Sequence, residues 1–156
     1  MTNSVRILAI AMALTPPAWA ADVTYRKDIR PLWEATCATC HGAQSPYFGD
    51  FMENKDKFTK SLKGPRMDSY ADLIYFIGWP DTGALMRRLD DGKGAKDGKP
   101  GNMYQYLGKT EDERQNNLTL FKAWLGEDAW FHNRWDAKGD VPGVTKEALS
   151  KLKLKY

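Results

Sequence analysis

Two cysteines and a histidine at a fixed spacing carry the clearest chemistry in the chain, in the pentapeptide Cys37-Ala38-Thr39-Cys40-His41. On a helix, residues three and four positions apart share a face, so these three side chains would point in one direction. Two thiols can add to the vinyl groups of a haem while the imidazole ligates its iron, and C-x-x-C-H is the attachment sequence of haem c. The pattern therefore predicts one covalently attached haem c, bound through Cys37 and Cys40, with His41 as the proximal iron ligand.

Two other interpretations of the cysteine pair are open at this point. One is a pair of buried thiols beside an ordinary histidine. The other is a redox-active C-x-x-C of the thioredoxin kind, which should lie next to a βαβ pattern. No such pattern is visible in the sequence. The histidine directly after Cys40, together with the export signal described next, favours haem.

The first 20 residues have the pattern of a secretory signal peptide. Arg6 precedes an apolar run over residues 7–14, and Ala18-Trp19-Ala20 supplies the small-x-small ending, so cleavage is expected after Ala20. The apolar run is too short to span a bilayer, which leaves an uncleaved membrane anchor as the alternative. We therefore predict a signal peptide over residues 1–20, localisation in the periplasm, and no transmembrane segment after cleavage.

The composition limits the remaining classes of function. The chain has 23 Lys and Arg against 20 Asp and Glu, so it lacks the concentrated basic footprint that nucleic-acid binding requires. Without the signal peptide, 136 residues remain, which is the size of one domain. No later long apolar run, no internal repeat and no second C-x-x-C-H is present. We expect a soluble domain with one haem and no nucleic-acid partner.

Helix signals surround the haem motif. Asp28 as N-cap and Pro31 in the first turn predict a helix over residues 28–42 that ends at Gly42 and carries the motif. Residues 43–67 show no strong period and are predicted to form a long loop over one side of the haem. A helix capped by Asp68 or Ser69 follows.

The second half of the chain alternates helices and loops. The helix after residue 68 should close near Gly78, and a short helix is expected over residues 82–89. Residues 90–102 are rich in Gly, Lys and Asp and predict a loop that leads to Met103. Thr110 and Glu113 form a capping box for a last main helix with an apolar stripe of Leu118, Phe121 and Leu125.

Gly126 should end that helix, and residues 127–156 form a C-terminal extension. The extension contains an aromatic segment over residues 130–135 and a short basic helix from Thr145. The aromatic segment is expected to cover the core, with docking to a partner as its alternative. The basic helix is expected to be a solvated terminal helix, again with docking as the alternative.

The order of these elements resembles class I cytochromes c. The resemblance covers about residues 28–126, and Asp28-Ile29-Arg30-Pro31 is similar to the D-I-x-P found ahead of the haem motif in bacterial cytochrome c domains. It implies an all-α, cytochrome c-like fold, a small helical domain around one covalently bound haem. In this family the first and last helices cross and the haem lies in the cage they make. The predicted domains are a cytochrome c domain over residues 21–126 and the extension over residues 127–156, after the signal peptide.

The same resemblance implies that Met103 is the distal iron ligand, because Met103 lies in a Gly-flanked loop shortly before the last helix. Met67 and Met52 are the second candidates and His132 is the third. Met86 falls on the apolar stripe of a short helix and is predicted to be core. An iron with an open sixth position is the remaining alternative.

A His/Met ligand pair raises the reduction potential of a haem and leaves no position for a substrate. We therefore predict a periplasmic monohaem c-type cytochrome that is not an enzyme and carries one electron between respiratory redox partners. Its partner would be a periplasmic or membrane-bound oxidoreductase. The alternatives are a haem enzyme or gas-binding sensor with an open or labile sixth position, and a haem subunit of a larger oxidoreductase complex.

Overall fold

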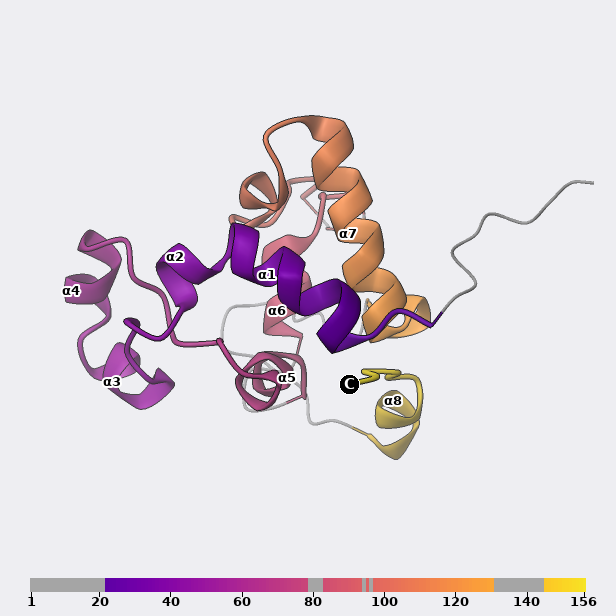
Figure 1. Ribbon diagram of the computed structural model, residues 1–156, viewed down its shortest axis with the longest axis horizontal. Helices are drawn as coiled ribbons and strands as arrows, with labels where there is room; N and C mark the ends of the chain where they lie inside the picture. Colours follow the sequence, from indigo (N-terminus) through magenta and orange to yellow (C-terminus); the bar gives the residue numbers. More distant parts are fainter. Residues whose placement is uncertain (1–21, 79–82, 94, 96, 131–144) are drawn as a thin grey trace, which may run out of the picture.

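The computed structural model describes residues 22–78, 83–93, 95, 97–130 and 145–156, which form helices and turns without a β-strand among them. The predicted all-α class is confirmed. Helix α1 (Arg30–Thr36) and the helical turn before it cross α7 (Glu111–Leu125), while α5 (Tyr70–Gly78) and α6 (Ala84–Leu89) complete the central cluster (Figure 1). The predicted signal peptide lies outside the described residues. Within them, no helix combines the length and the apolar character that crossing a bilayer would require.

The N-terminal helix begins earlier than predicted. A π-helical turn, η2 (Tyr25–Ile29), runs directly into α1, and its N-cap is Thr24. The Thr24 hydroxyl accepts a hydrogen bond from the Lys27 N–H at 3.3 Å, while the Asp28 carboxylate accepts one from the Thr24 N–H at 2.8 Å. The prediction of Asp28 as N-cap was therefore wrong. Asp28 acts from inside the first turn, where it reaches back to the capping residue as the acidic member of a capping box does.

The core is one cluster built from all the central helices. The predicted stripe of α7 is fully buried, and so is Met86 of α6, with 1% of its surface exposed. Trp33 of α1 is also core, with 5% exposed. The cluster has these further large members: Tyr25, Ile29, Leu73, Phe76, Ile77, Leu85, Leu89, Leu107, Trp124 and Trp130. Of the aromatic segment over residues 130–135, only Trp130 is among the described residues.

Residues 43–67 are not the long loop that was predicted. They contain α3 (Phe48–Glu53) and α4 (Lys55–Lys60), which form a lobe on the far side of α2 (Ala38–His41) from α7 (Figure 1). The rings of Phe51 and Phe58 stack with centroids 6.4 Å apart and join the two helices. Phe48 packs edge-on against Phe76 of α5, with ring centroids 5.6 Å apart. These two six-residue helices are too short to show an apolar period, because neither has a fully buried side chain and only a few of their residues are partly buried.

Helix α4 ends in a Schellman motif. The Lys63 N–H donates to the Phe58 carbonyl at 2.9 Å, and the Leu62 N–H donates to the Thr59 carbonyl at 3.0 Å. The left-handed position of this motif usually holds glycine, but here it holds Leu62, with φ of 54°. The turn directs the chain back toward α2.

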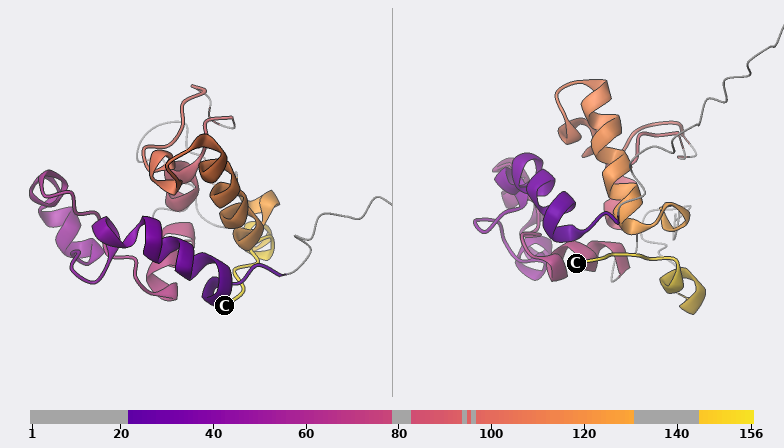
Figure 2. Two further views of the ribbon diagram at one scale, coloured as in Figure 1. Left: turned by 45° about the horizontal axis from the view of Figure 1, so that its top comes forward. Right: turned by 45° about the vertical axis from the view of Figure 1, so that its right-hand side comes forward.

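The C-terminal residues 151–156, here the C-terminal segment, follow the short helix α8 (Lys146–Ser150), which Thr145 caps. The segment returns to the start of the first helix (Figure 2). The Tyr25 and Arg26 N–H groups donate to its carbonyls at Lys155 and Tyr156, at 2.8 and 3.0 Å. The first N–H groups of a helix have no partner within it, so the end of the chain supplies acceptors for the beginning.

The same segment satisfies the end of α7. The carbonyls of Trp124 and Leu125 accept hydrogen bonds from the N–H groups of Leu154 and Lys153, each at 3.0 Å. The Tyr156 ring packs against the rings of Tyr25 in η2 and Tyr70 in α5, with centroids 5.7 Å and 5.0 Å away.

We expect Leu62→Gly to stabilise the protein by about 0.5–1 kcal/mol, since glycine adopts positive φ without the steric cost of a side chain. Leu62 is 77% exposed, so little packing is lost. Chemical denaturation of the haem-loaded protein measures the change. A loss of stability would show that the Leu62 side chain makes a stabilising contact in solution.

We expect Gly126→Ala to destabilise the protein by about 2 kcal/mol or more. Gly126 ends α7 with φ of 107°, and a Cβ there would lie 2.5 Å from the Lys151 carbonyl oxygen. Gly49→Ala in α3 is the matched control, because a Cβ at Gly49 meets no atom within 4 Å. Thermal unfolding compares the two variants, and an equal midpoint in both would contradict the prediction.

Candidate haem site

One helical turn carries the three residues of the predicted haem motif. Cys37 lies at the junction of α1 and α2, and Cys40 and His41 lie on α2. The Cys40 and His41 N–H groups donate to the Cys37 carbonyl at 3.2 and 3.0 Å, which holds the turn closed. The predicted helix over residues 28–42 is therefore divided in two at Cys37, and Gly42 follows its last turn as expected.

The two thiols are not bonded to each other. Burial raises the pKa of the Cys37 thiol, and the nearby Thr36 hydroxyl, 3.3 Å from Sγ, lowers it by less. A redox-active C-x-x-C of the thioredoxin kind needs the opposite, a thiol with a depressed pKa. Both cysteines are partly buried and free, so they are available for covalent addition to haem.

The imidazole of His41 is fixed in the form that binds iron. Its Nδ1 lies 2.8 Å from the Pro65 carbonyl oxygen, which can only accept, so Nδ1 carries the proton and Nε2 has the free lone pair. Burial lowers the pKa of His41, and the hydrogen bond to Pro65 raises it by less, so the ring is neutral at physiological pH. A neutral imidazole oriented through its other nitrogen is the usual arrangement of a metal-ligating histidine. The residues present therefore fit a haem iron.

Residues 64–67 form a backbone cradle around that imidazole. The Gly64 N–H donates to the Cys40 carbonyl and the Met67 N–H donates to the His41 carbonyl, both at 2.8 Å. A Cβ at Gly64 would overlap the imidazole ring, so only glycine allows the backbone to approach this closely. Sequence reasoning missed Gly64 and Pro65, although a Gly-Pro dipeptide is a marker of a turn with a special backbone.

Side chains from the α3–α4 lobe support α2. The Ser45 hydroxyl donates to the Cys40 carbonyl at 2.8 Å, and the Lys63 ammonium donates to the Thr39 carbonyl at 2.9 Å. In a helix as short as α2, most carbonyls have no hydrogen-bond partner within the helix. The Ser45 and Lys63 side chains donate to two of them. The lobe therefore stabilises the turn that carries the haem motif.

Met103, the predicted distal ligand, is partly buried against the core. It precedes the short 3-10 helix η3 (Tyr104–Leu107), and its N–H donates to the Arg88 carbonyl at the end of α6 at 3.0 Å. The Gly101 N–H donates to the Asp90 carbonyl at 2.8 Å. A Cβ at Gly101 would overlap carbonyl oxygens of α6, so this glycine lets the loop lie directly on the helix end.

The other candidate ligands differ in their surroundings. Met67 lies two residues after Pro65, is partly buried against the core, and donates its N–H to the His41 carbonyl at 2.8 Å. Met52 is 55% exposed on α3. Met86 belongs to the core, and His132 lies outside the described residues.

The domain is helical, and α1 crosses α7. The turn after α1 carries two free thiols and a neutral imidazole with a free Nε2 lone pair. Together these features are typical of a c-type cytochrome. A profile of the PccH cytochrome c family matches residues 24–156, and the chain belongs to this family. The fold is similar to that of the monoheme cytochrome PccH from Geobacter sulfurreducens, with 50% sequence identity and a TM-score of 0.74. That alignment covers 86% of this chain and 99% of the other. No curated protein sequence matches the chain.

These comparisons confirm the predicted class, a monohaem c-type cytochrome whose cofactor is one covalently bound haem c. The family match continues to residue 156, well past the region of residues 28–126 in which the sequence resembles class I cytochromes c. The C-terminal segment is therefore a family feature rather than an addition peculiar to this chain.

We expect Gly64→Ala to displace the His41 imidazole, because the added Cβ and the ring cannot occupy the same space. The variant should be isolated with less covalently bound haem, and the haem it retains should lose part of its low-spin character. Absorption spectra and haem staining of the purified protein measure both effects. Gly49→Ala is again the control, and a Gly64→Ala variant indistinguishable from it would contradict the cradle.

Proposed function

We propose that this chain is a periplasmic one-electron carrier whose haem is attached at Cys37 and Cys40 and whose iron is held between His41 and Met103. Membership of the cytochrome c family supports electron transfer as the general activity. The observation that carries the detailed proposal is the His41 geometry, with a neutral ring held through Nδ1 by Pro65 and enclosed by the Gly64 backbone. When bound, the haem supplies an iron that changes its oxidation state by one electron.

The placement of Met103 supports it as the distal ligand. Met86 is fully buried in the core and Met52 is exposed on the lobe, whereas Met103 lies partly buried in the loop before η3. The hydrogen bond from its N–H to the Arg88 carbonyl ties its backbone to the end of α6. With haem bound, the Met103 thioether together with the His41 imidazole would favour ferrous iron and would leave no position on it for oxygen or peroxide.

The sequence supports the proposed location and partners. Residues 1–20 have the order of regions of an export signal, which supports delivery to the periplasm. There the protein would exchange electrons with a periplasmic or membrane-bound oxidoreductase, and it would perform no chemistry on a substrate of its own.

Absorption spectra of the purified wild-type protein and of Met103→Ala test this proposal, each recorded in the ferric and ferrous states with and without carbon monoxide. We expect a low-spin wild type with the weak far-red band of methionine–iron ligation and no reaction of the ferrous form with carbon monoxide. We expect Met103→Ala to lose the band and to bind carbon monoxide, because one iron position has become free. Met67→Ala and Met52→Ala serve as controls and should behave as wild type.

Different results would support other functions. A high-spin wild type that binds carbon monoxide readily would overturn the carrier and favour a haem enzyme or gas sensor. A low-spin wild type that Met103→Ala leaves unchanged would keep the carrier and move the distal ligand to another residue, with His132 the next to substitute.

A further inference from the structure

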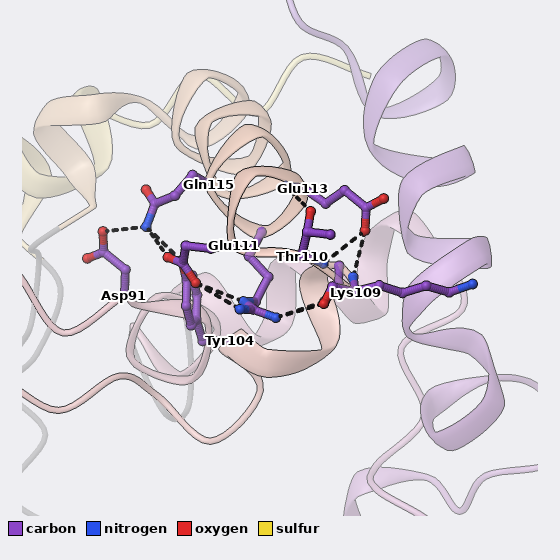
Figure 3. Close-up of polar contacts among 9 residues, drawn as sticks. Asp91, Tyr104, Lys109, Thr110, Glu111, Glu113 and Gln115 are labelled. Atoms are coloured by element: carbon purple, nitrogen blue, oxygen red, sulfur yellow. Dashed lines mark hydrogen bonds and ion pairs between the residues drawn. The ribbon is translucent and has the colours of Figure 1, made fainter.

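Tyr104, the residue after the proposed distal ligand, is anchored to α7. Tyr104 is buried, with 7% of its surface exposed, and its hydroxyl reaches the first turns of α7 (Figure 3). It donates to Glu111 Oε1 at 2.5 Å, and the Gln115 amide nitrogen lies 2.7 Å from the same hydroxyl oxygen. The Gln115 amide is also 3.1 Å from Glu111 Oε1, so the three groups form a closed triangle of hydrogen bonds.

The acceptor in this triangle is itself held in place. Arg114 donates to the second oxygen, Glu111 Oε2, from Nη2 at 2.9 Å and from Nε at 3.0 Å. Hydrogen bonds from Tyr104, Gln115 and Arg114 lower the pKa of Glu111 to about 2, so the carboxylate is ionised at neutral pH. Hydrogen bonds to an ionised acceptor are shorter and stronger than those between neutral groups.

The triangle also extends to the loop before Met103. The Gln115 amide lies 3.3 Å from Asp91 Oδ2, and Asp91 is the residue after the C-cap of α6. The Arg88 guanidinium at the end of α6 donates to Asn102 Oδ1 at 2.9 Å. Met103 thus lies between a loop fixed to α6 and a tyrosine fixed to α7.

We propose that Tyr104 and Glu111 are positioning residues for the distal ligand, which keep Met103 at the iron and set how readily the methionine leaves it. The inference rests on the proposed function, since it requires Met103 to be that ligand. Without the Tyr104 anchor, the start of η3 loses its side-chain hydrogen bonds to α7, while the Asn117 amide of α7 still donates to the Leu107 carbonyl at the end of η3 at 2.6 Å. The backbone hydrogen bond to the Arg88 carbonyl is then the tie nearest to Met103. The methionine then dissociates more often, although neither anchoring residue touches the haem iron.

The test uses full-length, haem-loaded Tyr104→Phe and Glu111→Gln, which retain the shape of each side chain. We expect the far-red methionine–iron band to weaken and the ferrous protein to bind carbon monoxide about tenfold faster in Tyr104→Phe, with a change in the same direction in Glu111→Gln. The reduction potential should fall in both variants, because a weaker thioether bond stabilises ferrous iron less.

Two variants control for effects unrelated to the anchor. Tyr106→Phe removes the hydroxyl of a tyrosine that is 58% exposed in the same short helix. Asp112→Asn removes a carboxylate charge from the same first turn of α7 at an exposed position, and so reproduces the loss of favourable charge at the helix N-terminus. Both should match the wild type in the far-red band, carbon monoxide binding and potential.

The outcomes separate this inference from the assignment of the ligand. If Met103→Ala abolishes the band while Tyr104→Phe and Glu111→Gln behave as their controls, the ligand assignment holds and the positioning role is overturned. If the two variants lose only thermal stability, with an unchanged band and carbon monoxide rate, the contact is merely structural and the inference is again overturned. If the band persists in Met103→Ala, the ligand assignment fails first and the inference fails with it.

Discussion

The hydrogen bond between His41 Nδ1 and the Pro65 carbonyl is the constraint on which the rest of the site depends. It places a backbone oxygen behind the imidazole, which requires the chain to leave the haem motif, turn, and return within hydrogen-bond distance. The α3–α4 lobe provides that return, and the left-handed Leu62 directs its end toward α2. The close approach then excludes any side chain at Gly64. The lobe is thus better understood as the support of one imidazole than as a separate cover for the haem.

A second constraint concerns the ends of the two crossing helices. The start of η2 leaves N–H groups without partners in its own helix, and the end of α7 leaves carbonyls without partners in its own helix. The crossing brings these two ends close together. The C-terminal segment lies between them and satisfies both sets, with Tyr156 packed against Tyr25 and Tyr70. Because unsatisfied buried backbone groups cost as much as a lost hydrogen bond, the last residues of the chain stabilise the crossing itself. The family match includes this segment, since it continues to residue 156.

Local signals allowed much of this fold to be predicted from the sequence. Three predicted features depend only on residues within two turns of one another, and each is present in the structure. They are the capping box of Thr110 and Glu113, the cap at Ser69 and the apolar stripe of α7. The features that were missed depend on contacts between distant segments. The role of Gly64 and Pro65 depends on the His41 imidazole, which is 24 positions before Pro65 in the sequence. The C-terminal segment forms hydrogen bonds with residues of η2, far from it in the sequence. The two helices of the lobe were not predicted for a different reason, because each is too short to show an apolar period in the sequence.

The two proposed iron ligands are anchored by different kinds of interaction. His41 is held by backbone groups of residues 64–67, with the Pro65 carbonyl at Nδ1 and the Gly64 backbone against its ring. Met103 is held through Tyr104 by an ionised carboxylate on a partly exposed helix end. Substitutions on the surface of α7 can therefore alter the methionine side of the site while the histidine side is unaffected. A cytochrome built in this way can vary the strength of its distal bond through polar residues on one helix and still retain the covalent attachment and the proximal ligand.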